Sequence, residues 1–282
     1  MELEIMTTTD WISWLIYMQS ILLPVGAILF LALESWSFSG IAPPWRQRWR
    51  HDLSNWGLWL VVFLLFNYFL STALLPIMPL MEMYRVGMLY FLGLPPWLHA
   101  LLGFLLYDFA GYLFHRLSHE VRWLWLVHAV HHSDNAMDIS THVRAHPLHV
   151  LTAICFRVLV VAALGIPYWV ILLNELLSLP VAQLHHSAVR WPNKWEQMLN
   201  KLIVTPPMHR LHHSSNPRYT DSNYGSLVPW WDFALGTYSQ DEETHTSDRI
   251  PETGLATLSD PYWQGVVGML LTPFAQRGRS ML

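Results

Sequence analysis

Long apolar runs constrain the fold of this chain more than any other feature. Residues 11–33 and 56–78 are each long enough to cross about 30 Å of hydrocarbon. A third run, 86–114, is interrupted by Pro95 and Pro96, which predicts a short re-entrant piece before the helix proper. Soluble domains carry about 25% charged residues, whereas this chain carries 13%. The sequence therefore predicts an all-α integral membrane protein.

The apolar run at 150–184 predicts a helical hairpin in the membrane. It is too long for one crossing, and Gly165-Ile166-Pro167 breaks it near its middle. Within the run only Arg157 and Glu175 carry formal charges, and each lies nine residues from Ile166. Equal distance from the turn means equal depth, about 13 Å at 1.5 Å per residue. We therefore predict that Arg157 and Glu175 face each other or share a polar network with Asn174.

Basic residues predict the orientation and the domain organisation. Given these spans, all of the sixteen Lys and Arg residues except Arg85 and Arg157 fall on one side, which the positive-inside rule makes cytoplasmic. We expect four to five transmembrane or re-entrant helices, capped by a cytoplasmic histidine-rich helical domain. The expected parts are an N-terminal transmembrane region (1–104), a catalytic region that includes the hairpin (105–240) and a C-terminal tail (241–282).

Composition excludes several classes of function. The formal net charge of −4, with no long basic run, argues against nucleic acid as a partner. The single cysteine, Cys155, excludes an intrachain disulfide and a thiolate metal site. The first ten residues contain no base, so no cleavable signal peptide is expected.

Three histidine clusters dominate the polar segments. They are His115-Arg-Leu-Ser-His119, His128-Ala-Val-His131-His132 and His209-Arg-Leu-His212-His213. Helical residues at i, i+3 and i+4 share a face, so each cluster can direct two or three imidazoles at one point. Neutral imidazole binds iron, zinc, copper and nickel. One HxxxH is commonly incidental, but these eight rings exceed what one ion can accept and predict two metal ions.

The motifs resemble those of the fatty-acid hydroxylase and sterol desaturase superfamily, whose members are membrane-bound di-iron enzymes. The resemblance covers about residues 105–238. Besides the three clusters it includes Asp108, Arg144-Ala-His146-Pro147, His185-His186-Ser187, Asn223-Tyr224-Gly225 and Trp231-Asp232. It implies a di-iron centre that activates O₂ and inserts oxygen into a C–H bond of a lipid, or removes hydrogen from one.

Carried over by position, the resemblance also implies the site residues. The metal ligands become His115, His119, His128, His131, His132, His209, His212 and His213. One more comes from the end of the hairpin, where spacing favours His186 over His185. His146 is a further candidate ligand. The family's His-Ser-Asn reads His186-Ser187-Ala188 here, so any supporting Asn is missing at that point. Because metal-bound rings donate their second N–H to an acceptor, we expect Asp108 and Asp232 to receive such bonds.

The implied activity is that of an iron-dependent oxidoreductase of the monooxygenase type, which hydroxylates a fatty-acyl, alkyl or sterol-like chain. Desaturation and ether-lipid oxidation at the same site remain alternatives. Because the sequence has no nucleotide or flavin signature, electrons are expected from a separate electron-transfer protein or reductase. A metal transporter would place histidines within the spans, and a zinc hydrolase needs only three ligands and a water. Both fit less well.

Two segments near the last cluster carry further predictions. The apolar stripe of residues 191–204 predicts an amphipathic helix that lies on the bilayer. Residues 219–237 are punctuated by Gly and Pro and predict a loop.

Overall fold

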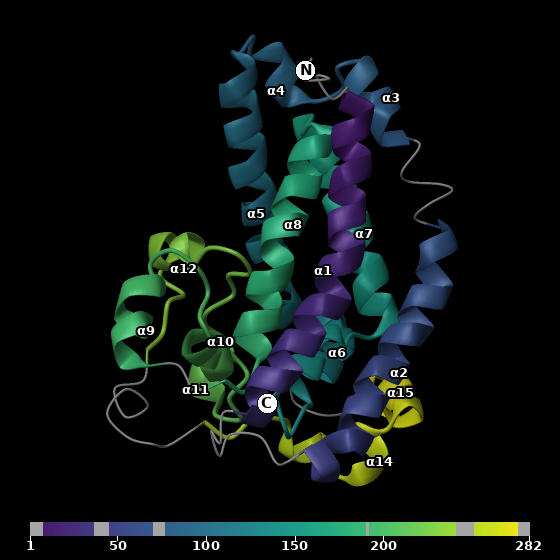
Figure 1. Cartoon of the computed structure of the whole chain (residues 1–282), viewed down its shortest axis with the longest axis vertical. Coiled ribbons are helices and arrows are strands. Elements are labelled where there is room, and N and C mark those ends of the chain that lie inside the picture. Colours follow the sequence, from purple (N-terminus) through teal and green to yellow (C-terminus); the bar gives the residue numbers. More distant parts are fainter. Residues whose placement is uncertain (1–7, 37–44, 70–76, 190–191, 241–250, 276–282) are drawn as a thin grey trace, which may run out of the picture.

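The computed structural model describes residues 8–36, 45–69, 77–189, 192–240 and 251–275. These residues form helices joined by turns and loops, with an isolated bridge between Ser214 and Thr253. The long helices are α1 (Thr8–Trp36), α2 (Trp45–Phe69), α5 (Pro96–Glu120), α7 (Pro147–Leu164) and α8 (Tyr168–His186). They form a bundle whose helices run mostly along the long axis of the molecule (Figure 1). The expectation of an all-α chain is confirmed for the described residues.

Shorter helices cover the ends of this bundle. The third apolar run breaks at the two prolines, as expected, because α4 ends at Phe91 and α5 begins at Pro96. The short elements are α3 (Ile77–Met83), α4 (Met88–Phe91), α6 (Arg122–His132), η2 (Ile139–Val143), α9 (Asn193–Leu199), α10 (Pro206–His212), α11 (Pro217–Thr220), α12 (Trp230–Leu235), η3 (Ala256–Leu258), α14 (Pro261–Gln264) and α15 (Val266–Ala275).

Two helices in the described part of the chain are long and apolar enough to cross a membrane, namely α5 and α7. A shorter apolar helical stretch lies within α1, at Ile21–Glu34. Length and composition thus support membrane character for α5 and α7. The larger number of spans expected from the sequence remains a prediction.

The hairpin forms where it was predicted. Gly165 ends α7 in the left-handed conformation (φ 76°), which glycine adopts without a Cβ clash. Arg157 on α7 forms an ion pair with Glu175 on α8, so the predicted pairing is confirmed. Tyr107 of α5 completes the contact, because its hydroxyl accepts from Arg157 Nη1 (2.9 Å) and donates to Glu175 Oε1 (2.8 Å). Helices α5, α7 and α8 are therefore joined by one polar contact that lies between their apolar faces.

The first helix packs along the second arm of the hairpin. The side chain of Gln183 on α8 lies against Gly26 of α1, and its Nε2 donates to the Leu23 carbonyl (2.9 Å). At the other end of α1, Glu34 Oε1 accepts from the backbone N–H groups of Ile139 (2.9 Å) and Ala188 (2.8 Å). These contacts join α1 to the segments that follow α6 and α8.

Two expectations for the C-terminal half need correction. The amphipathic helix predicted at 191–204 is shorter, because α9 ends at Leu199. The predicted loop at 219–237 contains the end of α11 and all of the short helix α12. Residues 251–275, assigned to the tail, include α15, whose Met269 packs in a buried cluster with Leu58 and Val130. The apolar side chains of α15 account for this burial.

Candidate metal centre

Four helices deliver histidines to one region of the bundle, near the end of α5 where α6, α8 and α10 converge (Figure 1). The last turns of α5 carry His115 and His119, and the whole second cluster lies on α6. The end of α8 carries His186, and α10 with its C-cap residue carries the third cluster. The i, i+3 and i+4 spacing thus works as expected, since each helix directs one face inward.

The rings form two groups. Within each group the available ligand atoms all lie within 4.8 Å of one another. We call them the five-histidine group (His115, His119, His128, His132 and His212) and the four-histidine group (His131, His186, His209 and His213). Nine of the ten histidines expected as ligands are therefore brought together.

Adjacent residues serve different groups. His131 and His132 are neighbours in sequence, as are His212 and His213, yet each pair is divided between the two groups. Residues four apart stay together, because His128 and His132 have Nε2 atoms 3.2 Å apart, and so do His209 and His213. An HxxHH motif on a helix therefore places ligands in two sites at once.

Backbone carbonyls fix the protonation of several rings. In the five-histidine group, Nδ1 of His115 donates to the Tyr224 carbonyl (2.8 Å) and Nδ1 of His212 to the Ser222 carbonyl (2.6 Å). In neutral rings the protons then sit on Nδ1, and Nε2 is left with a lone pair. The two Nε2 atoms are nevertheless only 3.1 Å apart. Two lone pairs cannot form a hydrogen bond with each other, so the two nitrogens are placed to bind one cation together.

The four-histidine group repeats this arrangement. Nδ1 of His131 donates to the Arg144 carbonyl (3.2 Å) and Nδ1 of His186 to the Ala182 carbonyl (2.7 Å). Their Nε2 atoms lie 3.2 Å apart. Two ligands at right angles around one ion, with bonds of about 2.1 Å, are about 3.0 Å apart. The residues of both groups thus fit a metal ion, and the buried, unpartnered Nε2 of His119 fits one as well.

Burial keeps these rings neutral and ready to bind metal. It is the largest cause that lowers the pKa of His131, to about 3. Burial, followed by repulsion from neighbouring histidines, also holds the pKa of His212 and His213 well below the usual range. Neutral imidazole is the form that coordinates metals. The groups need no deprotonation at neutral pH.

The remaining histidines expected near the site lie outside both groups. His146 caps α7, where its Nδ1 accepts from Leu148 N–H (3.1 Å) and its Nε2 donates to the Leu270 carbonyl (3.2 Å). Both nitrogens are thus occupied, so we leave His146 out of the ligand sets that we propose. His185 stacks on His209 with ring centroids 4.0 Å apart and joins neither group.

Neither expected acidic acceptor has a described hydrogen bond to a histidine ring. Asp108 accepts from the indole N–H of Trp231 (2.7 Å). Asp232 accepts from the backbone N–H groups of Tyr224 and Gly225 (both 2.8 Å) and so shapes the loop whose Tyr224 carbonyl receives His115. Asp232 therefore supports the candidate ligand His115 indirectly, through the backbone of Tyr224.

The acceptors that do contact the rings carry little signal in the sequence. Most are backbone carbonyls, which any residue provides. The exception is Asp221, whose carboxylate accepts from Nδ1 of His119 (3.2 Å). The position of Asp221, shortly after the third histidine cluster, was the one sequence signal for this acceptor.

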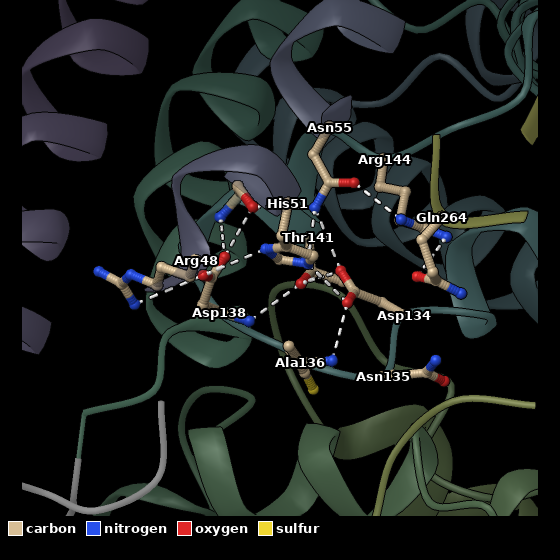
Figure 2. A network of polar contacts seen from close by, with 12 residues as sticks. Arg48, His51, Asn55, Asp134, Asn135, Ala136, Asp138, Thr141, Arg144 and Gln264 are labelled. Atoms are coloured by element: carbon tan, nitrogen blue, oxygen red, sulfur yellow. Dashed lines mark hydrogen bonds and ion pairs between the residues drawn. The ribbon is translucent and has the colours of Figure 1, made fainter. Parts of the chain in front are cut away.

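A third group of possible ligand atoms involves His51, Asp52 and Asp138. Figure 2 shows two of its members, His51 and Asp138, within a network of charged and polar side chains. Nη1 of Arg48 lies 3.4 Å from Asp138 Oδ2, and Nε2 of His51 lies 2.7 Å from Asp134 Oδ1. Because a cation of the protein already faces these carboxylates, we assign no metal to this group.

Comparison with known proteins agrees with the geometry. A family model described as fatty acid hydroxylase matches residues 100–237. Ornithine lipid hydroxylase OlsE of Rhizobium tropici is 30% identical over 181 residues, which are 64% of this chain and 52% of that protein. Alkylglycerol monooxygenase of Homo sapiens is 32% identical over 177 residues, and that of Danio rerio is 32% identical over 171. The human match covers 62% of this chain and 38% of the relative, and the Danio rerio match 58% and 37%.

The chain thus spans about half the length of the bacterial relative and less than two fifths of the two monooxygenases. No solved structure is a significant match. The matched family region contains all nine grouped histidines and the helices α6, α7, α8 and α10. By this match, residues 100–237 form a fatty acid hydroxylase domain.

Proposed function

We propose that the protein is a membrane-bound di-iron oxygenase that uses O₂ to hydroxylate a C–H bond of a lipid. The observation that carries the proposal is the pair of lone-pair contacts, His115 with His212 and His131 with His186, one in each group. Two sites of this kind, built from imidazole alone, match the family whose domain this chain contains. Imidazole accepts several metals, and the choice of iron rests on the family.

Each group would hold one iron ion, and the pair of ions would activate O₂ for attack on the C–H bond. The protein's own residues orient and shield the site. Carbonyls of Tyr224, Ser222, Arg144 and Ala182 hold the rings in one tautomer. Burial of the rings keeps bulk water away, as oxygen chemistry on an alkyl chain requires.

The membrane setting defines the substrate class. Candidate spans α5 and α7 lead to the histidines, so an acyl, alkyl or sterol-like chain would enter laterally from the bilayer. We place four to five crossing or re-entrant helices in the membrane and the histidine groups on the cytoplasmic side, following the distribution of basic residues. Two electrons per turnover would then come from a separate cytoplasmic reductase or electron-transfer protein.

Ether-lipid oxidation is a second candidate, because three relatives that match at 32% identity are alkylglycerol monooxygenases. Desaturation would use the same site. These outcomes differ in which substrate hydrogen lies nearest the oxidant, and the products distinguish them.

Lipid analysis of cells grown under ¹⁸O₂ tests the proposal. Cells that express the protein should contain a lipid that has gained one ¹⁸O atom, or an ether lipid converted to oxygenated cleavage products. Loss of two hydrogens would instead indicate desaturation. Cells with the His212→Ala and His213→Ala double variant should lack the product. Metal uptake without any lipid product would point to a transporter and contradict the proposal.

A further inference from the structure

Arg144 lies at the centre of a set of contacts around the four-histidine group. Its side chain is fully buried, and its backbone carbonyl accepts from Nδ1 of His131 (3.2 Å). Its Nε donates to the carbonyl of Val130, the residue before His131 (2.8 Å). One residue thus holds both the ring of His131 and the backbone that carries it.

The rest of the guanidinium is anchored to distant segments. Nη1 donates to Asn55 Oδ1 on α2 (2.9 Å), and Nη2 donates to Ser133 Oγ (2.8 Å) and Gln264 Oε1 on α14 (3.2 Å). Figure 2 shows Arg144 between Asn55 and Gln264. Asn55 is itself fixed, because its Nδ2 donates to Asp134 Oδ2 (3.2 Å) and Ser140 Oγ (2.9 Å).

Two of these anchors belong to parts of the chain outside the matched family region. Asn55 and Gln264 lie on either side of residues 100–237. The planar fork of arginine can serve several acceptors at once, whereas the single ammonium group of lysine cannot reproduce that geometry. Removing the fork would leave the carbonyls of Val130 and Arg144 free to move, and the ring of His131 would move with them.

We propose that Arg144 is a positioning residue of the four-histidine group, which ties the orientation of His131 to helices α2 and α14. This inference rests on the proposed function, since it assumes that the group holds a metal ion. Groups that orient a metal-bound histidine typically change metal affinity by 10- to 100-fold when they are removed. We expect a change of that size at one ion and none at the other.

Cobalt(II) titration of the full chain in detergent tests this assignment. The effect is isolated in two backgrounds that each keep a single group. His119→Ala with His212→Ala leaves the four-histidine group, and His186→Ala with His213→Ala leaves the five-histidine group. Arg144→Met should shift the chelator concentration that releases cobalt by 10- to 100-fold in the first background. In the second it should shift nothing.

Two further variants separate positioning from charge and from general stability. Arg144→Lys keeps the charge but loses the planar guanidinium. It should therefore still lower the cobalt affinity of the four-histidine group and alter the visible cobalt spectrum. Arg116→Met is the matched control, since Arg116 follows His115 but pairs with Glu120 at the surface. Arg116→Met should leave the chelator concentration that releases cobalt unchanged in both backgrounds.

Several outcomes would overturn the inference. These are full rescue by Arg144→Lys, equal shifts in both backgrounds, or no shift in either. If Arg144→Met does not fold, Gln264→Met removes one anchor only and should weaken the same ion selectively. An equal or absent effect of Gln264→Met refutes the assignment. Wild-type protein that binds fewer than two ions would instead refute the proposed function, before Arg144 is tested.

Discussion

Alanine substitution of His212 and of His213 should weaken two different metal ions. The two residues are adjacent in sequence, but His212 lies in the five-histidine group and His213 in the four-histidine group. Either change removes one imidazole of similar burial from the same short helix region. The variants therefore form a matched pair in which the identity of the affected ion is the main difference.

The expected magnitude follows from the number of ligands that remain. A four-ligand zinc site binds with roughly 10–16 kcal/mol at neutral pH, which is about 2.5–4 kcal/mol per ligand. At 1.4 kcal/mol for each factor of ten, loss of one ligand raises Kd by about 10²- to 10³-fold. His213→Ala leaves three imidazoles and His212→Ala leaves four, so His213→Ala should have the larger effect.

Chelator titration with elemental analysis measures both ions. Wild-type protein should hold two ions per chain, and each single variant should release one of them at a lower chelator concentration. The double variant should show both shifts together, while the control His245→Ala, which changes a histidine outside the three sequence clusters, should show none. If the double variant behaves like either single variant, the two residues serve the same ion, and the division into two groups is refuted.

Three other predictions concern the membrane, the loop and the pH dependence. Arg157→Glu or Glu175→Arg alone puts two like charges in place of the ion pair and should cost at least about 2.5–3.5 kcal/mol, the cost of one unpaired charge in a transmembrane helix. The exchanged pair should recover thermal stability in detergent, and failure to recover it would contradict direct pairing. Asp232→Asn should loosen the Tyr224 carbonyl, which accepts a hydrogen bond from Nδ1 of His115. It should lower the affinity of the five-histidine group for its ion by about tenfold in the same chelator titration. An unchanged release midpoint would contradict this link. Metal-free protein should lose stability as pH falls below about 6.5, because the pKa of His131 in the folded chain is lowered to about 3. Between these two pH values the unfolded chain binds more protons than the folded chain. Thermal melting at stepped pH measures this loss, and a melting temperature that rises on acidification would contradict it.

The hairpin was predictable because its signals are local and geometric. A Gly-Ile-Pro break at the midpoint of an apolar run defines the turn, and equal spacing from that turn places Arg157 opposite Glu175. The histidine groups were predictable for a similar reason, since i, i+3 and i+4 spacing defines a helix face. Helix geometry thus carried both inferences, together with the Gly-Ile-Pro break for the hairpin and the family resemblance for His186.

The partners of the rings were not predictable in the same way. The sequence suggested Asp108 and Asp232 as acceptors, yet four of the nine grouped rings donate to backbone carbonyls, which have no sequence signature. Spacing favoured His186 over His185, and His186 is the one that lies in the four-histidine group, but the rotation of α8 that presents it depends on packing against α1 and α10. The ending of α9 at Leu199 likewise reflects tertiary context rather than its apolar stripe.

The contacts of Glu34 have a consequence for the order in which the protein is made. Its carboxylate on α1 binds the backbone of Ile139 and Ala188, which are 105 and 154 residues later in the chain. At a synthesis rate of about 5–20 residues per second, Ala188 follows Glu34 by about 8–30 s. During that interval Arg48, only 14 residues on, is the partner that can neutralise the carboxylate. The backbone of Ala188, which follows His186 closely, can bind Glu34 only after that interval. We therefore expect metal to be loaded late in biogenesis, onto a bundle that is already inserted.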